Sequence, residues 1–162
     1  MVDSLVPIGV EAEAEVLDTR AEVSDAAFTT EGSHPERSER KDFFVERHGL
    51  RFAGTHLILD LWEAERLDDV AHMECALRRC VEVAGATLLH LHLHRFTPNG
   101  GISGVAVLAE SHISVHSWPE RGYAAFDIFM CGAARPHRAI EVLREAFRPK
   151  RMTVTEQLRG VF

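Results

Sequence analysis

From about Phe52 onward, the pattern of apolar and polar positions is regular enough to predict strands and helices. Apolar and β-branched residues after Gly54 predict a strand over 55–62. Apolar residues three and four positions apart predict a helix over 67–85, with Gly85 as its C-terminal stop. Leu and His then alternate with a period of two, which predicts a second strand over 86–96.

The rest of the chain adds further strands and a second helix. After a Pro-Asn-Gly-Gly turn, the predicted strands cover residues 102–118 (one long strand, or two with a bend near Ser111), 123–131 and 151–158. A helix is expected over 136–147, because Pro136 is tolerated in a first helical turn and Pro149 follows its end. The order strand, helix, four strands, helix, strand predicts an α+β fold. We expect a two-layer α/β sandwich in which an antiparallel sheet carries two helices on one face.

The first 41 residues differ in composition from the rest. Between Glu11 and Glu31 there are seven acidic residues against one basic residue, Arg20. Such a segment has too few apolar residues to bury a core, so we expect an acidic tail without stable structure over 1–41. The chain of 162 residues then has room for one folded domain, which we place at 52–162.

Overall composition narrows the class of protein. A formal net charge of −7 argues against a nucleic-acid or acidic-membrane surface. The sequence contains no apolar run of about 18 residues, and its N-terminus does not resemble a secretory signal. Three cysteines without an export signal indicate reduced thiols. We therefore expect a soluble, cytoplasmic protein with neither a nucleic acid nor a membrane as partner.

The predicted strand over 86–96 suggests one candidate chemistry. His90, His92 and His94 fall on one face of it, and His56 belongs to a strand that we expect to lie adjacent. Imidazole is a common ligand of zinc and iron, so a metal-binding module is one alternative function. The other interpretation is a polar outer face of the sheet.

The cysteines suggest a second alternative. Cys131 ends a predicted strand and could act as a nucleophile with His116 or His112, as in a cysteine hydrolase, although no nucleophile-elbow motif is present. A lone cysteine there is more often a small core residue. Cys75 and Cys80 lie near the apolar stripe of the first helix, so we expect both in the core.

The segment "ESHISVHSWPE" (110–120) carries the most specific signal. Its strand pattern puts imidazoles and hydroxyls on one face, and "GYAAFDIFMCG" (122–132) follows. Together they closely resemble the prokaryotic S-adenosylmethionine decarboxylase proenzymes. The resemblance continues through "HRF" (94–96), "SGV" (103–105) and "GTHLILDLW" (54–62), and covers about residues 52–160. Two departures from the family pattern, Met130 in place of threonine and one extra residue in "TPNGGISG" (97–104), do not touch the reactive residues.

The resemblance implies that the chain is a zymogen that cleaves itself between Glu110 and Ser111. The products would be chains 1–110 and 111–162, and Ser111 would become a pyruvoyl group, the only cofactor. His116 matches the family histidine that assists this autocatalytic cleavage. Ser103 matches a serine that supports the same step, for which donation of a hydrogen bond to the developing oxyanion would be suitable chemistry.

The resemblance also implies the reaction, that of a carboxy-lyase. The pyruvoyl ketone would form a Schiff base with S-adenosyl-L-methionine and accept the electrons left by CO₂, the electron-sink role of pyridoxal phosphate elsewhere. Cys131 matches the proton donor. Phe96 matches a residue that stacks on adenine and Glu120 one that accepts from the ribose hydroxyls, while Trp118 would contact the substrate or simply pack.

Several further expectations follow from the resemblance. The decarboxylated product serves spermidine and thus polyamine biosynthesis, no metal is implied, and His112 is expected near the site. Family members assemble as homodimers, or larger oligomers, of cleaved pairs with active sites at the interface. A pyruvoyl decarboxylase for another amine, such as ornithine or arginine, remains an alternative, which Phe96 and Glu120 disfavour.

Overall fold

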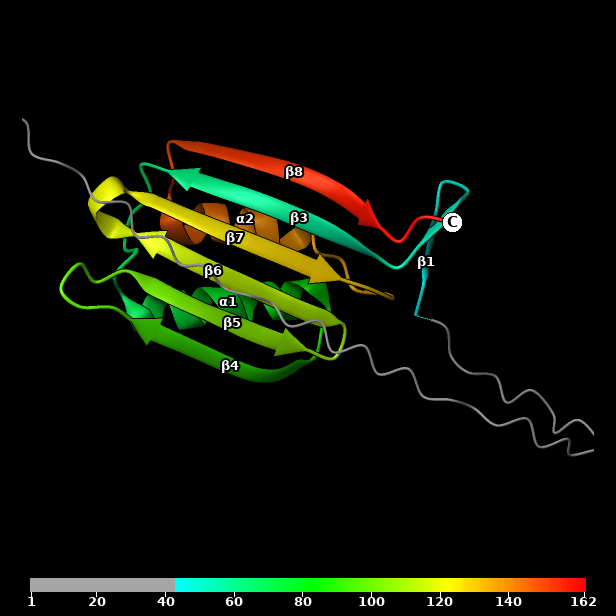
Figure 1. Cartoon of the computed structure of the whole chain (residues 1–162), viewed down its shortest axis with the longest axis horizontal. Coiled ribbons are helices and arrows are strands. Elements are labelled where there is room, and N and C mark those ends of the chain that lie inside the picture. Colours follow the sequence, from blue (N-terminus) through cyan, green and yellow to red (C-terminus); the bar gives the residue numbers. More distant parts are fainter. Residues whose placement is uncertain (1–42) are drawn as a thin grey trace, which may run out of the picture. The chain divides into compact units, whose positions relative to one another are not determined.

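The computed structural model describes residues 43–162, which belong to one compact unit. The predicted acidic tail over 1–41 lies outside the described residues. Most of the unit is a six-stranded antiparallel sheet with strand order β4-β5-β6-β7-β3-β8 (Figure 1). The strands are β3 (Gly54–Trp62), β4 (Leu88–Arg95), β5 (Ile102–Leu108), β6 (Ser111–Trp118), β7 (Tyr123–Met130) and β8 (Arg151–Arg159).

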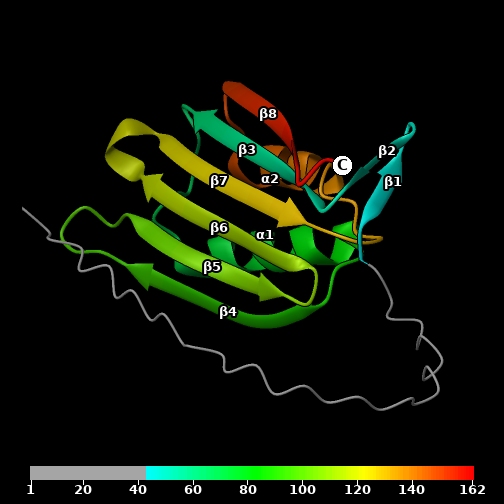
Figure 2. The ribbon, with the colours of Figure 1, turned by 45° about the vertical axis from the view of Figure 1, so that its right-hand side comes forward.

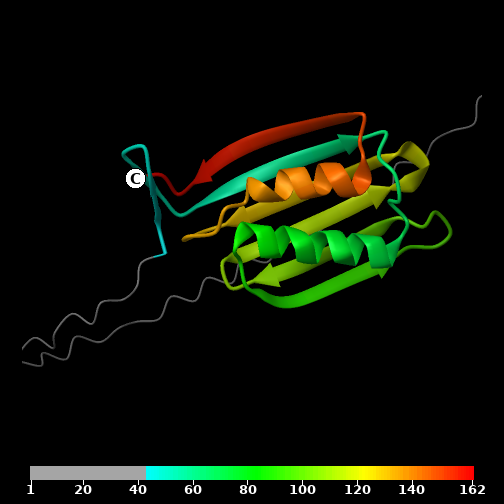
Figure 3. The same ribbon diagram turned by 180° about the vertical axis from the view of Figure 1, so that it is seen from behind.

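Two helices, α1 (Val70–Ala84) and α2 (Arg138–Phe147), lie side by side on one face of this sheet (Figure 3). Asp69 caps α1 by accepting the backbone N–H of His72 at 3.0 Å. Gly85 ends α1 with a left-handed φ of 70°, so its expected role as the stop is confirmed. A single turn of 3₁₀ helix, η1 (Pro119–Arg121), joins β6 to β7.

The hydrophobic core lies between the sheet and the helices. Alternate residues of each central strand point toward the helices, as Leu57, Leu59 and Leu61 do in β3, and all three are fully buried. They pack with the buried stripe of α1 and with Leu143 and Phe147 of α2. The observed architecture is therefore the predicted α+β sandwich.

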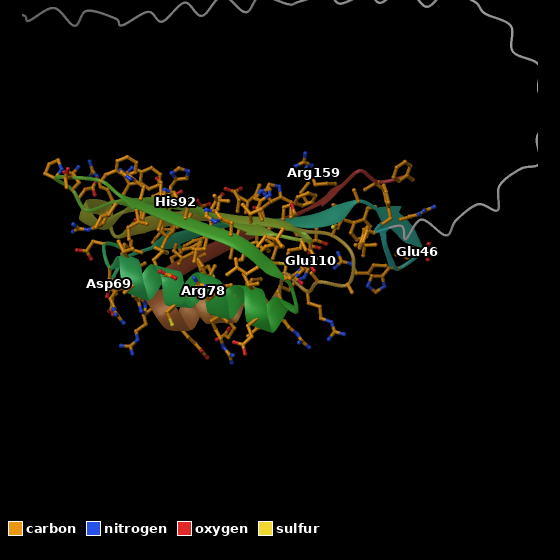
Figure 4. All side chains as sticks on the ribbon, turned by 90° about the horizontal axis from the view of Figure 1, so that it is seen from below. Glu46, Asp69, Arg78, His92, Glu110 and Arg159 are labelled. Atoms are coloured by element: carbon orange, nitrogen blue, oxygen red, sulfur yellow. The ribbon has the colours of Figure 1, made fainter. Side chains whose placement is uncertain are left out.

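The opposite face of the sheet is covered by no helix among the described residues (Figure 4). His92 and Arg159 project from it, whereas Asp69 and Arg78 lie on the helical side. As the pattern over 111–118 predicted, Ile113 and Val115 are buried while His116 is exposed. We call this surface the open face.

Two expectations about local structure need correction or refinement. Residues 102–118 form two strands, and the turn between them, Ala109–Glu110, comes just before Ser111. Cys80 is buried as expected, but Cys75 is exposed, because it lies off the buried stripe of α1.

A short hairpin precedes the sheet and was not predicted. Its strands are β1 (Val45–Arg47) and β2 (Leu50–Phe52), and it lies at the end of the sheet where β7 and β8 finish (Figure 2). None of the described helices is long and apolar enough to cross a membrane.

Candidate active site

The peptide carbonyl of Glu110 is held by a single residue, Cys131, which directly follows the neighbouring strand β7. Ser111 pairs with Met130 across β6 and β7, so the next residue, Cys131, lies beside Glu110. The backbone N–H of Cys131 donates to the Glu110 carbonyl oxygen at 3.1 Å, and its thiol Sγ donates to the same oxygen at 3.1 Å. Two donors aimed at one carbonyl oxygen would stabilise negative charge developing on it.

The side chain of Glu110 is also fixed. Its carboxylate accepts the backbone N–H of Thr87 at 2.8 Å and the Thr87 hydroxyl at 3.3 Å. The backbone N–H of Ala109 donates in return to the Thr87 carbonyl at 3.0 Å. Thr87, in the connection between α1 and β4, therefore fixes the position of Glu110 on the acyl side of the Glu110–Ser111 bond.

Ser111, on the other side of this bond, is held in an unusual conformation. Its φ is 145°, a region that residues other than glycine seldom adopt, so its backbone is strained. The Ser111 hydroxyl lies 3.1 Å from Nδ1 of His112. A strained serine beside a polarised carbonyl is the arrangement that an intramolecular attack on the preceding peptide requires.

A second group of candidate residues lies at the other end of the open face. Ser103 and His116 are paired across β5 and β6, with 2.7 Å between the Ser103 hydroxyl and His116 Nδ1. The ring of Trp118 lies 6.3 Å from that of His116 and 5.2 Å from that of Tyr123. Phe96 and Glu120 come just after β4 and β6 respectively, and both are exposed.

The two groups are separated within one chain. We call Glu110, Ser111, His112 and Cys131 the cleavage end, and Phe96, Ser103, His116, Trp118 and Glu120 the distal end. Ser111 and His116 are five residues apart on one extended strand, which corresponds to about 16 Å. His116 therefore cannot reach the hydroxyl of Ser111 in its own chain.

Comparison with known proteins identifies the family. The pattern that describes the family "S-adenosylmethionine decarboxylase" matches residues 55–160 of this chain. The chain is 45% identical over 113 residues to the S-adenosylmethionine decarboxylase proenzyme of Thermomicrobium roseum, covering 69% of this chain and 97% of that protein. It belongs to the S-adenosylmethionine decarboxylase family.

Further relatives agree with this assignment. The corresponding proenzyme of Methanococcus aeolicus is 44% identical over 114 residues, covering 68% of this chain and 97% of that protein. The crystal structure of the adenosylmethionine decarboxylase from Aquifex aeolicus superposes with a TM-score of 0.63 at 33% identity. That comparison covers 68% of this chain and 93% of the Aquifex chain.

Proenzymes of the S-adenosylmethionine decarboxylase family carry a pyruvoyl group derived from serine. The cleavage end fits such a group, because Ser111 combines a strained backbone with a carbonyl neighbour that already has two hydrogen-bond donors. The cysteine hydrolase alternative fits less well. The thiol of Cys131 donates to the Glu110 carbonyl rather than to His112 or His116.

The histidine-strand alternative rested on an adjacency that is wrong. His56 lies in β3, which is separated from β4 by β7, β6 and β5, a distance of about 19 Å across four strand spacings. Its Nε2 instead lies 3.1 Å from Oδ1 of Asp127. Within residues 43–162, no cluster of three His, Cys, Asp or Glu side chains is arranged to hold a metal ion.

Sequence reasoning also missed two carboxylates on the open face. Asp127 bridges His56 and the hydroxyl of Ser114, and Asp60 accepts the Tyr123 hydroxyl at 2.6 Å. The hydrogen bond to Asp60, followed by burial, raises the pKa of Tyr123 to about 12. Both aspartates occupy the polar half of an alternating strand pattern, which is the one signal that could have found them.

Proposed function

We propose that this chain is a proenzyme that cuts itself between Glu110 and Ser111 and then decarboxylates S-adenosylmethionine. Its decarboxylase domain would span residues 52–162. The observation that carries this proposal is the Glu110 carbonyl oxygen, held by the N–H and thiol of Cys131 next to the strained Ser111. The enzyme is a carboxy-lyase, and its product donates aminopropyl groups for spermidine synthesis.

The self-cleavage step needs only side chains, backbone groups and water, with no external coenzyme. The hydroxyl oxygen of Ser111 attacks the carbonyl carbon of Glu110, and the donors from Cys131 stabilise the oxyanion. The peptide C–N bond then breaks, and Glu110 is left as an ester on Ser111. Loss of the Ser111 α-proton then breaks the ester C–O bond, which releases chain 1–110 with a main-chain carboxylate at Glu110 and leaves dehydroalanine at residue 111. The dehydroalanine tautomerises to an imine, and water hydrolyses the imine to the pyruvoyl ketone and ammonia.

This sequence needs a base for the proton on Ser111, and the Ser103–His116 pair has the right chemistry. Because that pair lies at the distal end of its own chain, we propose that a second copy supplies it. In a two-fold dimer with open faces packed together, the cleavage end of each chain meets the distal end of the other.

The open face suits such an interface. Ile58, Val107 and Trp118 are large apolar side chains that are 37–42% exposed on it. Its aspartates already accept hydrogen bonds from neighbouring side chains, so burial would not leave them unpaired. The proposed partner is therefore a second, cleaved copy of this chain, forming a homodimer with two active sites.

The pyruvoyl group, once formed, supplies a ketone that takes up the substrate amine and accepts the electron pair left by departing CO₂. Side chains carry out proton donation and substrate binding. Cys131 returns a proton to the substrate carbon, Phe96 stacks on the adenine, and Glu120 accepts hydrogen bonds from the ribose hydroxyls. The exposed ring of Trp118 offers its face to the sulfonium cation.

We also place the reaction in the cytoplasm. The proton-donor role requires Cys131 as a thiol, and all three cysteines of the chain are unpaired. Free thiols persist in reducing compartments.

Denaturing mass spectrometry tests the proposal, with and without borohydride reduction in the presence of S-adenosylmethionine. We expect two chains split between Glu110 and Ser111, with the smaller linked by reduction to the substrate. Two chains without an adduct would move the substrate to another amine. A single intact chain from active protein would overturn the pyruvoyl mechanism.

A further inference from the structure

We propose that the segment Phe43–Phe52, which contains the β1–β2 hairpin, positions Cys131 for self-cleavage and for proton donation. We call it the N-terminal hairpin segment. It precedes the part of the chain that matches the family pattern, which begins at residue 55. The inference rests on the proposed function, because it assigns this segment a role at the same site.

The segment touches the residue next to Cys131. The backbone N–H of Gly132 donates to the carbonyl oxygen of Phe43 at 2.9 Å. A Cβ placed on Gly132 would lie 3.6 Å from Cδ1 of Phe43, so the ring lies against this glycine. Gly132 itself has a φ of 62°, a left-handed conformation that glycine adopts without steric cost.

These contacts fix Cys131 from both sides. Its own N–H is bound to the Glu110 carbonyl, and the following peptide plane is bound through Gly132 to Phe43. A peptide unit is planar, so fixing both flanking units leaves Cys131 little rotation. The direction of its thiol toward the Glu110 carbonyl therefore depends on Phe43.

The segment also forms one wall of a cavity at the scissile bond. The cavity holds about 470 Å³ and is lined by Phe43, Phe44, Val45 and Glu46 on one side. Glu110, with Gly132 and the two alanines that follow it, lines the other side together with Gly85. Figure 4 shows Glu46 and Glu110 toward the same end of the sheet.

The hairpin is also anchored to β8, His137 and the C-terminal residue, so it can act as a fixed support. The guanidinium of Arg47 lies 2.5 Å from Oε1 of Glu156 in β8, and His137 contacts the other oxygen at 3.0 Å. The N–H of Phe162 donates to the Arg51 carbonyl at 3.0 Å, and its ring packs edge-on against Phe44. Phe52 is fully buried.

The test compares Phe43→Gly, which removes the ring and loosens the backbone carbonyl, with Leu50→Gly in the same segment. Both native side chains are largely exposed, at 61% and 45%, but Leu50 does not line the cavity. We expect self-cleavage to slow about tenfold in Phe43→Gly, as misplacement of a positioned group predicts. Phe43→Tyr should restore the rate, and Leu50→Gly should leave it near that of the parent.

A second readout separates positioning from stability. In a Cys75→Ser background, alkylation of Cys131 should become faster in Phe43→Gly, because a loosened Phe43 carbonyl holds Gly132 less firmly and frees the thiol from the Glu110 carbonyl. Cys80 serves as the internal control, since burial raises its pKa to about 12 and keeps its thiol unreactive. After cleavage is complete, kcat should fall in Phe43→Gly with KM unchanged.

Equal cleavage rates and equal Cys131 alkylation in the two glycine variants, at matched Tm, would overturn the inference. So would a slower rate explained entirely by a lower folded fraction, for which Phe43→Ala provides a milder substitution. Failure of the proposed function has a different signature, because the parent chain itself would then not cleave.

Discussion

Glu110 is fixed by hydrogen bonds to both its main-chain carbonyl and its side-chain carboxylate. Its carbonyl oxygen is bound by Cys131 and its side-chain carboxylate by Thr87, so neither end of the acyl group can move independently. Attack by a neighbouring hydroxyl is fast only when the two reacting atoms are held close and aligned. On the proposed mechanism Thr87 is therefore a positioning residue for cleavage, although it contacts no reacting atom.

Glu110→Ala should slow self-cleavage about tenfold, because the anchor to Thr87 is lost while the scissile carbonyl remains. Glu110→Gln keeps an oxygen that can accept the Thr87 N–H, so its rate should stay close to that of the parent. The measurement is the conversion of intact chain to two chains over time. Once cleavage is complete, kcat per cleaved chain should be similar in all three proteins; a decrease confined to kcat would assign Glu110 to decarboxylation instead.

At this scale the sequence predicted residues that lie within a recognisable motif. Ser111 and Cys131 were found because the segments around them resemble a family, and the structure brings them together through the pairing of β6 with β7. Thr87 and Phe43 were missed because their contacts join distant parts of the chain through backbone atoms. An exposed threonine and an exposed phenylalanine carry no periodic signal.

The longer secondary-structure elements were predicted well. Strands of seven to nine residues and helices of ten and fifteen residues repeat their apolar pattern often enough to be recognised. β1 and β2 have three residues each, too few for a pattern. Their turn, His48-Gly49, has positive φ at both residues, and this dipeptide was the available signal.

The anchor of the hairpin predicts a dependence of stability on pH. Hydrogen bonds from Arg47, and secondarily from His137, lower the pKa of Glu156 below its ordinary value of 4.5. A carboxyl with a lowered pKa stabilises the fold above that ordinary value, and the stabilisation is lost as pH falls through the folded-state pKa. Since both partners are more than one third exposed, we expect less than about 1 kcal/mol.

Glu156→Gln should therefore lower the free energy of unfolding slightly at pH 7 and make a smaller difference at pH 3. Denaturant unfolding at both pH values measures this, with Glu65→Gln as a control for removing an exposed glutamate. A deficit in Glu156→Gln that persists unchanged at pH 3 would mean that the ion pair with Arg47 is not its cause.

For the whole molecule, strand order was the property that sequence could not supply. The pattern predicted every strand of the main sheet, but not that β3 inserts between β7 and β8, far from β4. Because of that order, His56 in β3 does not lie beside His90, His92 and His94 in β4. The fold also leaves the cleavage end and the distal end at opposite ends of one face, so on the proposed mechanism a single chain holds two incomplete halves of a site.

Mixing two inactive variants tests whether a second copy completes the site. Ser111→Ala lacks the nucleophile and His116→Ala lacks the proposed base, so neither should cleave efficiently alone. When the two are co-expressed, a mixed dimer contains one intact site, made of Ser111 from one chain and His116 from the other. With random pairing, about half of the His116→Ala chains should be cleaved, and the Ser111→Ala chains should stay intact.

Differently tagged chains and denaturing mass spectrometry distinguish the two products. The matched control pairs the His116→Ala chain with a chain carrying both substitutions, which leaves no intact site in any dimer and should give no cleavage. If His116 acted within its own chain, co-expression of the two single variants would yield only the sum of their separate rates. Cleavage of the His116→Ala chain only in the presence of the Ser111→Ala chain requires that the base cross from one copy to the other.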